Sequence, residues 1–392
     1  MDLVVVFALA LLVGVLLSDL ASRSILSTAI FFLAAGVVAR LVGAVELEPS
    51  SSGVRELIEL ALFAVLFTDA LKVGVSDLAR AWRLPGRALL FGMPATMVLT
   101  ALLARSLAGL GWTESFLLGA VLAPTDPVLA SAIIGRPTVP ARLRHLLNVE
   151  SGLNDGLALP FVLVLISVAA GTEADALTIA TELLLGVALG VVVPAIAIVI
   201  ARARLLTASV AYEPLHGFAI GLAVYALGRA THANLFLAAF AAGVTVATLS
   251  PAIRHRFDDF GSAVAELLKL ASLLLLGLFI VPDELGAVGI GGFVFAALVL
   301  FAVRPVAVGA SLLGGGLSRG EFWAAGWFGP KGFASVVYGL LILASGMDGA
   351  PRLFSLTVLV IIGSIVVHST TDHVVAERFR RSAERAEVEA SG

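Results

Sequence analysis

The chain has 392 residues, of which 59% are hydrophobic and 14% charged, and its formal net charge is −3. Soluble domains carry about 25% charged residues, so this composition excludes an ordinary soluble protein and indicates an all-α polytopic membrane protein. The chain contains no cysteine, which excludes disulfides, thiolate metal sites and cysteine nucleophiles. It contains no Walker loop, so a pump driven by ATP hydrolysis has no support.

Apolar stretches of about 20 residues are long enough to cross a bilayer, and thirteen of them follow one another along the chain. The first begins beside an acidic residue, Asp2, where a signal peptide would carry basic residues. We therefore read it as a span that is retained. The predicted spans cover residues 3–21, 24–45, 53–72, 86–108, 113–135, 142–170, 174–201, 213–231, 233–249, 260–281, 285–314, 320–346 and 353–377.

The lysines and arginines set the expected orientation. Seventeen of the 25 lie in alternate loops or in the C-terminal tail, five lie on the opposite side, and three lie within spans. Cytoplasmic loops carry the excess of lysine and arginine. The sequence therefore predicts an N-terminus outside the membrane and a C-terminus in the cytoplasm.

Span five contains two prolines and a carboxylate in the stretch "LAPTDPVLAS", residues 122–131. Pro124 and Pro127 lack the N–H groups that would bond to carbonyls one turn earlier, so the helix should break here. Non-helical backbone at membrane depth is tolerated where it is packed in protein or lines an aqueous cavity. The freed carbonyls and the Thr125 hydroxyl can ligate a dehydrated cation.

Span twelve has a matching break in "WFGPKGFASVVYG", where Pro330 and Lys331 lie between two glycines. The two broken spans are seven apart, which predicts two inverted six-helix repeats, spans 1–6 and 8–13, whose unwound helices cross. Such pairs indicate a midplane binding site in secondary transporters; the alternative is two ordinary proline kinks. We assign Asp126 to neutralising the positively polarised helix ends that would converge there.

Span six, "LRHLLNVESGLNDGLALPFVLVLIS", carries four polar side chains at helical spacing. Glu150 and Asn154 are four residues apart, as are Ser151 and Asp155, so all four share one helix face. Oxygen ligands suit hard cations such as Na⁺ and K⁺. We predict that Asp155 carries either a proton or a cation, with Ser151 as a co-ligand. A polar helix–helix contact without a transport role is the alternative.

The remaining buried charges need partners of their own. Lys331 is the expected partner of Glu150, and Lys269 is expected to pair with Glu266 one turn away on span ten. Arg304 in span eleven would either neutralise helix C-terminal ends near the crossing or extend to the membrane surface. His368 in span thirteen, with Ser364, mirrors the polar face of span six, so a proton relay stays open.

"PTDP" at 124–127, "ESGLNDG" at 150–156 and "GPKG" at 329–332 together resemble the monovalent cation/proton antiporter-1 family, which includes NhaP-type antiporters and NHE exchangers. The likeness covers nearly the whole chain, and the Glu-Ser-x-x-Asn-Asp pattern is its most specific part. It implies the NhaA/NhaP-like antiporter fold and a secondary transporter rather than an enzyme. The expected function is exchange of Na⁺, K⁺ or Li⁺ for H⁺ without a cofactor.

The resemblance also implies roles for individual residues. The acid matching Asp155 binds the ion, helped by the residues matching Ser151 and the Thr125 main chain, and Asn154 belongs to an Asn-Asp pair associated with electroneutral exchange. The residue matching Glu150 is paired with a basic residue on span twelve. The family usually has arginine where this chain has lysine 331. It also often has glutamate near the end of span three, where "LFTDALKV" offers Asp69 as a gate or accessory ligand.

We expect the chain to divide into moving and static parts. Residues 1–85 and 171–284 would form the scaffold and dimerisation helices, 86–170 and 285–378 the core with the ion site, and 379–392 a short cytoplasmic tail. The expected partners are monovalent cations, protons, the lipid bilayer and a second copy of the chain, but no nucleic acid. The expected location is a prokaryotic inner membrane.

The sequence disfavours two other classes of function. An ion channel would need a continuous filter, whereas the charges here lie at one level of the membrane. An intramembrane aspartyl protease using Asp126 and Asp155 would need tyrosine–aspartate and glycine–aspartate motifs on neighbouring helices, and neither acid has that context. A K⁺/H⁺ antiporter of the same fold remains the nearest alternative to a Na⁺/H⁺ antiporter.

Overall fold

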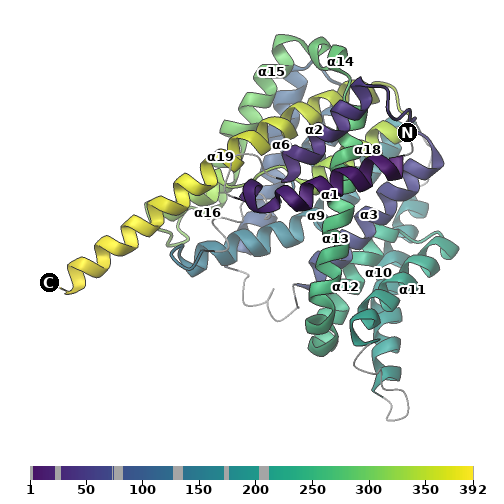
Figure 1. Cartoon of the computed structure of the whole chain (residues 1–392), viewed down its shortest axis with the longest axis horizontal. Helices are drawn as coiled ribbons and strands as arrows, with labels where there is room; N and C mark the ends of the chain where they lie inside the picture. Colours follow the sequence, from purple (N-terminus) through teal and green to yellow (C-terminus); the bar gives the residue numbers. More distant parts are fainter. Residues whose placement is uncertain are drawn as a thin grey trace.

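The computed structural model is helical in every regular element that it describes (Figure 1). The described residues are 3–22, 28–72, 74, 83–126, 136–171, 176–202 and 212–391. In chain order the helices are α1 (Leu3–Ser22), α2 (Thr28–Leu41), α3 (Ser52–Leu71), α5 (Pro85–Arg87), the π-helix η1 (Ala88–Gly92), α6 (Met93–Leu107), α7 (Trp112–Leu122), α9 (Ala141–Ala169), α10 (Ala176–Ala201), α11 (Glu213–Thr231), α12 (Leu235–Leu249), α13 (Pro251–Phe279), α14 (Pro282–Ala287), α15 (Gly289–Leu298), the π-helix η4 (Val299–Val303), α16 (Arg304–Leu312), α17 (Arg319–Trp327), α18 (Phe333–Ser345) and α19 (Ala350–Ser391).

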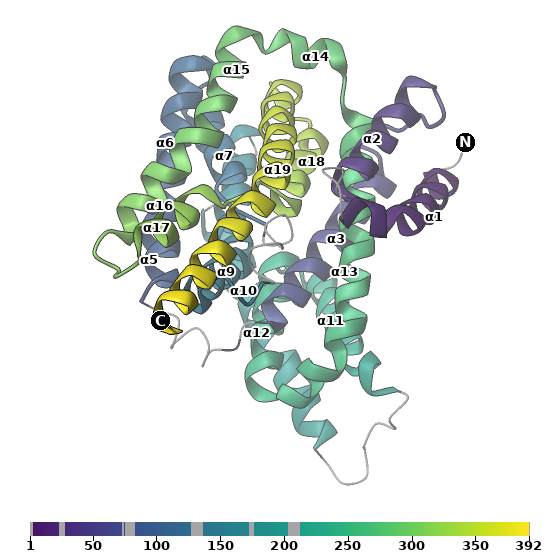
Figure 2. The ribbon, with the colours of Figure 1, turned by 60° about the vertical axis from the view of Figure 1, so that its left-hand side comes forward.

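The helices form two groups that meet at α9 and α18. In the first helix group (α5–α7, α15–α17 and α19), α6 packs on α7, α16 on α17 and α15 on α19. In the second helix group (α1–α3 and α10–α13), α13 packs on α2 and α3, and α12 on α3 and α10. Figure 2 separates α6, α15 and α16 on one side from α2, α3 and α13 on the other. Because α9 and α18 contact both groups, their side chains are the ones placed to form a site between the groups.

Several helices have the length and composition of membrane spans. Six of the described helical segments are long and apolar enough to cross a membrane, and five shorter helices are also apolar. Their outer faces carry large apolar side chains, such as Leu16 on α1 and Leu184 on α10, that are more than two-thirds exposed. Hydrocarbon, unlike water, is a favourable environment for such faces. The count of thirteen spans and the inverted repeats stay predictions.

Both predicted helix breaks are present in the described part of the chain. The helix α7 ends at Leu122, and residues 124–126 have no regular structure, whereas residues 127–135, which include Pro127, lie outside the described residues. The helix α17 ends at Trp327, residues 328–332 have no regular structure, and α18 begins at Phe333. Proline removes a donor from the helical ladder and clashes with the preceding turn, which accounts for a break at each position.

Two π-helical turns lie in helices that contact each other. η1 precedes α6 and η4 precedes α16, and each is followed within two residues by a proline, Pro94 or Pro305. The missing proline N–H leaves one carbonyl of the preceding turn without its usual donor. A π-turn also rotates the residues that follow it relative to a regular α-helix. This rotation sets the direction of Arg304, the first residue after η4.

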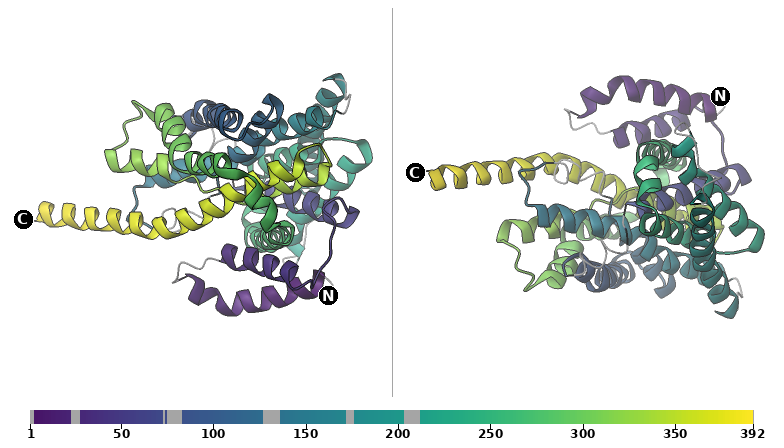
Figure 3. Two further views of the ribbon diagram at one scale, coloured as in Figure 1. Left: turned by 90° about the horizontal axis from the view of Figure 1, so that it is seen from above. Right: turned by 90° about the horizontal axis from the view of Figure 1, so that it is seen from below.

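The chain ends in one long helix, α19, which has 42 residues. It leaves the body of the molecule and carries the C-terminus away from it (Figure 1), whereas α1 and α2 lie together at another edge (Figure 3). The helix continues past residue 378, where the sequence placed the end of the core, into the expected tail of residues 379–392. Ion pairs of Arg380 with Glu377 and Glu384 lie one turn apart on this outer part, and such i,i+3 and i,i+4 pairs favour a helix.

Candidate functional site

The unwound stretches of spans five and twelve lie directly against each other. The backbone N–H of Asp126 donates to the carbonyl of Pro330 over 2.9 Å. The Asp126 carboxylate accepts a hydrogen bond of 3.0 Å from the N–H of Phe333, the first residue of α18. The first N–H groups of a helix have no partner within the helix and carry partial positive charge. Asp126 therefore satisfies one of these N–H groups and places a negative charge at the N-terminal end of α18.

Close packing at this contact requires a glycine at position 332. A Cβ atom built on Gly332 would overlap the side chain of Asp126. Only a residue without a Cβ lets the two backbones approach this closely. The "GPKG" sequence thus supplies both a break, through Pro330, and the space for the carboxylate of the other span.

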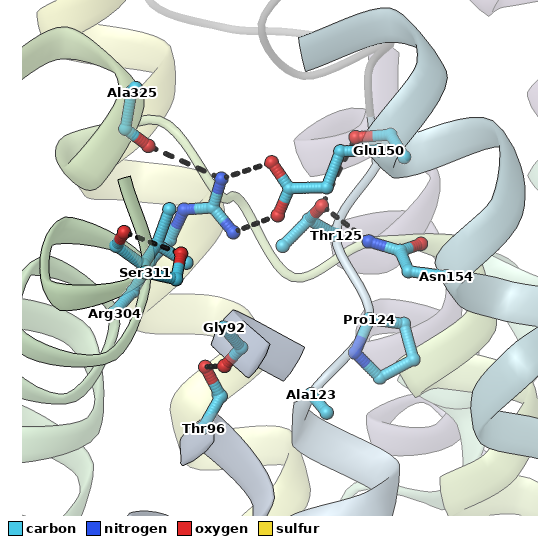
Figure 4. A network of polar contacts seen from close by, with 12 residues as sticks. Gly92, Thr96, Ala123, Pro124, Thr125, Glu150, Asn154, Arg304, Ser311 and Ala325 are labelled. Atoms are coloured by element: carbon cyan, nitrogen blue, oxygen red, sulfur yellow. Dashed lines mark hydrogen bonds and ion pairs between the residues drawn. The ribbon is translucent and has the colours of Figure 1, made fainter. Parts of the chain in front are cut away.

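A cluster of hydroxyl and amide groups lies beside the break of span five. Thr125 and Ser151 place their hydroxyl oxygens 3.0 Å apart, and the Asn154 side-chain amide donates to the Thr125 hydroxyl over 2.8 Å (Figure 4). All three side chains are less than 10% exposed. Because Ser151 and Asn154 lie on α9 while Thr125 follows α7, the cluster joins two elements and concentrates oxygen atoms in a buried place.

Asp155 is next to this cluster on α9 and is half-buried. Its carboxylate oxygen Oδ1 is buried without a hydrogen-bond partner among the described residues, as is the amide oxygen of Asn154. Leaving a buried acceptor unsatisfied costs about 1–3 kcal/mol, and more when the group is charged. A proton or a cation bound at Asp155 would remove that cost.

The backbone at Asp155 is held by a residue that lies outside the three sequence motifs. Tyr338, fully buried on α18, donates its hydroxyl hydrogen to the carbonyl oxygen of Asp155 over 2.6 Å. A buried tyrosine needs a partner for its hydroxyl. A tyrosine within the apolar helix that follows "GPKG" was the sequence signal that could have indicated this role, because tyrosine is rare in this chain, which has three in all.

The strongest electrostatic influences of other charged groups on Asp155 come from four residues. They are two carboxylates, Asp126 and Asp69, and two ammonium groups, Lys269 and Lys331. The formal charges of the four cancel. The negative charge of Asp155 itself is then left to be neutralised by whatever binds there.

The predicted ion pair between Glu150 and Lys331 is wrong. Glu150 instead binds Arg304 through two hydrogen bonds of 2.8 and 3.0 Å, and Arg304 also donates to the carbonyl of Ala325 over 3.3 Å (Figure 4). Glu150 is 4% exposed and Arg304 is 5% exposed. The physical reason is geometric: the turn η4 directs Arg304 towards α9, and its planar guanidinium matches both carboxylate oxygens.

Lys331 has a different set of contacts. Its ammonium group lies 3.4 Å from the carbonyl oxygen of Ala123 and 3.3 Å from that of Pro124, where span five unwinds. Its backbone N–H donates to the Ser364 hydroxyl over 2.7 Å. Carbonyls at the end of a helix carry partial negative charge. Lys331 therefore stabilises the broken end of span five, a role that the sequence analysis had considered for Arg304.

Asp69 lies on α3. It forms ion pairs with Lys72 at 2.9 Å and with Lys269 of α13 at 3.6 Å. The predicted intrahelical pair of Lys269 with Glu266 does not form. The Lys269 ammonium also lies 5.9 Å from the centre of the Phe333 ring, which is a cation–π distance. The Asp69–Lys269 pair therefore joins two helices of the second group, next to the first residue of α18.

Comparisons with known proteins place these residues in a wider context. The sequence model described as "Sodium/hydrogen exchanger, transmembrane" matches residues 5–378. The K⁺/H⁺ antiporter NhaP2 of Shewanella baltica (strain OS223) is 26% identical over 378 residues, which is 93% of this chain and 64% of that protein. The K⁺/H⁺ antiporter NhaP of Alkalimonas amylolytica is 25% identical over 373 residues, with the same coverage. This chain thus spans 64% of the length of these curated relatives.

The fold has a solved counterpart. The structure of the sodium proton antiporter MjNhaP1 from Methanocaldococcus jannaschii at pH 8 superposes with a TM-score of 0.79 at 18% sequence identity, covering 96% of this chain and 98% of the other. The two chains therefore share one fold over almost their whole lengths.

Proposed function

This chain belongs to the sodium/hydrogen exchanger family, and from that premise we propose that it is a secondary antiporter exchanging a monovalent cation for H⁺ across a membrane. One observation carries the proposal: the carboxylate of Asp155 has a buried oxygen without a partner, beside the oxygen cluster of Thr125, Ser151 and Asn154. The proposal needs no cofactor, because both substrates are ions.

Asp155 can hold a proton or a cation, but not both. A half-buried carboxylate among apolar helices gains from being neutralised. Oxygen ligands suit Na⁺ and K⁺, and Thr125 and Ser151 offer hydroxyl oxygens from two different elements. Binding of the cation then requires release of the proton. This competition at one carboxylate couples the two ion flows.

We propose that one cation is exchanged for one proton. Three other acids near the site already have partners: Glu150 is paired with Arg304, Asp69 with Lys72 and Lys269, and the Asp126 carboxylate accepts from the first N–H of α18. Asn154 is neutral in every state. The loaded site then carries the same charge in both halves of the cycle, and no net charge crosses the membrane.

Alternating access would come from movement of the two helix groups relative to each other. We propose that residues 86–170 and 285–378 form the moving core and that residues 1–85 and 171–284 form the scaffold, in an elevator-like motion. The location of the site at α9 and α18, which contact both groups, supports this division. We further propose a homodimer joined through the scaffold, in a prokaryotic inner membrane with the C-terminus in the cytoplasm. A crosslinking experiment in membranes that yields monomers alone would contradict the dimer.

The transported cation is proposed to be Na⁺ or K⁺. The Shewanella and Alkalimonas relatives carry the name K⁺/H⁺ antiporter, whereas the protein of similar fold is named a sodium proton antiporter. The assay should therefore offer each ion separately.

The test measures proton movement in liposomes that contain the purified protein and a pH-sensitive dye. An imposed gradient of Na⁺ or K⁺ should drive protons in the opposite direction in the native protein. Asp155→Asn should abolish the exchange, because an amide of almost the same shape cannot alternate between proton and cation. Asp283→Asn, at an exposed aspartate of α14, is the matched control and should exchange normally.

A second arm tests the charge balance. The potential does work of about 2.3 kcal/mol per 100 mV on each elementary charge moved. With Na⁺ as substrate, exchange should therefore be the same at zero potential and at a potential imposed by a K⁺ gradient, with a K⁺-free assay used instead if K⁺ proves to be a substrate. A strong voltage dependence would refute the one-to-one ratio. Saturable exchange by Asp155→Asn would refute the role of the carboxylate.

A further inference from the structure

The helix α19 is attached to both ends of the break in span twelve. At one end, the ring nitrogen Nε2 of His368 lies 3.2 Å from the carbonyl oxygen of Trp327, the last residue of α17. At the other end, the hydroxyl of Ser364 accepts the N–H of Lys331 over 2.7 Å. His368 and Ser364 are four residues apart, so they share one face of α19. Both side chains are at most 2% exposed.

The two attachments are linked to each other. The Ser364 hydroxyl oxygen lies 3.1 Å from the Nδ1 nitrogen of His368. Because that hydroxyl accepts from the N–H of Lys331, its own hydrogen is available for Nδ1. Nδ1 also lies 2.9 Å from the backbone carbonyl oxygen of Ser364, so both ring nitrogens face a carbonyl. With its proton on Nε2 the imidazole donates to Trp327 and can accept from the Ser364 hydroxyl, whereas with its proton on Nδ1 it donates to the Ser364 carbonyl and directs a lone pair at the carbonyl oxygen of Trp327. A hydrogen bond to Trp327 therefore requires a proton on Nε2.

The rings around His368 hold it in this orientation. The centroids of its ring and that of Trp327 are 5.7 Å apart, and the Phe328 ring lies at 6.4 Å. The indole N–H of Trp327 in turn donates to the hydroxyl of Thr371 on α19 over 3.1 Å. Two side-chain contacts therefore join the end of α17 to α19. The contact made by His368 is linked through Ser364 to Lys331.

Lys331 connects the contacts of His368 and Ser364 to the proposed ion site. Its backbone is fixed by Ser364, and its ammonium group lies against the carbonyls of Ala123 and Pro124. The next residue along span five is Thr125, which contacts Ser151 and Asn154. A shift of the unwound stretch 328–332 would move the ammonium group and, with it, the unwound backbone next to the cation ligands.

We propose that His368 is a positioning residue for cation exchange: by donating from Nε2 to Trp327 and accepting from Ser364 at Nδ1, it holds the break of span twelve at the spacing that places Lys331 on the broken end of span five. The proposal rests on the proposed function for its consequence, but the positioning itself can be measured without transport.

Two conservative variants separate the two ring nitrogens. In His368→Gln the side-chain amide reaches the place of Nε2 and can donate to Trp327. In His368→Asn it reaches the place of Nδ1, so the bond to Trp327 is lost. We expect His368→Gln to keep the native apparent KM for the cation, and His368→Asn to raise it about fivefold, the equivalent of one hydrogen bond. Ser364→Ala, which removes the acceptor for Lys331, should act like His368→Asn. Thr370→Val is the control, because its hydroxyl bonds within its own helix.

Hydrogen–deuterium exchange of the purified protein gives the second readout. Amides of residues 328–333 should exchange faster in His368→Asn and in Ser364→Ala than in the native protein, and at the native rate in His368→Gln and Thr370→Val. Equal exchange rates and equal KM values in all four variants would overturn the proposal. If the native protein moves no ions, the proposed function fails, while the exchange rates of residues 328–333 still decide the role of His368. If a His368 variant does not fold, the comparison of Ser364→Ala with Thr370→Val decides whether the proposal holds.

Discussion

The ion pair of Glu150 with Arg304 allows a quantitative test of what holds the core together. Arg304→Met keeps much of the apolar stem of the arginine and removes its charge. It also removes two hydrogen bonds to Glu150, at 2.8 and 3.0 Å, and one to the carbonyl of Ala325. Glu150 would then remain as a buried carboxylate, 4% exposed, without its compensating cation.

The size of the effect follows from the burial of both partners. Removing one member of a buried ion pair costs about 3–5 kcal/mol, because the other charge is left without compensation. Replacing both members by uncharged groups is often close to neutral. The single variant Arg304→Met should therefore be destabilised by about 3–5 kcal/mol, and the double variant Arg304→Met/Glu150→Gln should recover most of that loss.

The measurement is reversible unfolding of the purified protein in mixed detergent micelles, with thermal unfolding as a second readout. Arg380→Met is the control, since this arginine lies on the exposed outer part of α19 and exposed pairs contribute little. We expect the control to unfold like the native protein. A double variant as unstable as Arg304→Met would refute the reasoning, because the loss could not then come from an uncompensated carboxylate.

Two further substitutions test the contact between the broken spans. Lys331→Met leaves the Glu150–Arg304 pair in place, so it should cost less stability than Arg304→Met. It should nevertheless slow exchange, because the carbonyls of Ala123 and Pro124 lose their contact with the ammonium group. An equal loss of stability in unfolding measurements would instead support a pair of Lys331 with Glu150. Gly332→Ala should lower both the melting temperature and the exchange rate, because its new Cβ would overlap Asp126. Gly53→Ala, which meets no atom within 4 Å, serves as its control, and equal melting temperatures for these two glycine variants would contradict the close approach.

Much of the architecture is determined locally, and the sequence was sufficient there. Proline cannot donate within a helix, so Pro124 and Pro330 predicted breaks that the structure contains. The helical period places residues four apart on one face, so Ser151 and Asp155 could be assigned to a common face of α9 without knowledge of the rest of the fold. The helix α13 begins at Pro251 rather than at residue 260, because its first turns are charged and a search for apolar stretches does not detect them.

The choice of partners was decided by the tertiary structure. The sequence indicated Lys331 as the partner of Glu150, but Arg304 also lies in an interrupted helix, and chain distance does not distinguish the two. Which residue pairs with Glu150 depends on the turn η4, after which Arg304 reaches α9. It also depends on the unwound residues 328–332, from which Lys331 reaches the carbonyls of span five. Lys269 likewise forms its ion pair with Asp69 on another helix and not with Glu266 one turn away. Side-chain pairing depends on which helix faces meet, and that is set by packing between segments far apart in the sequence rather than by the residues on either side of a charge.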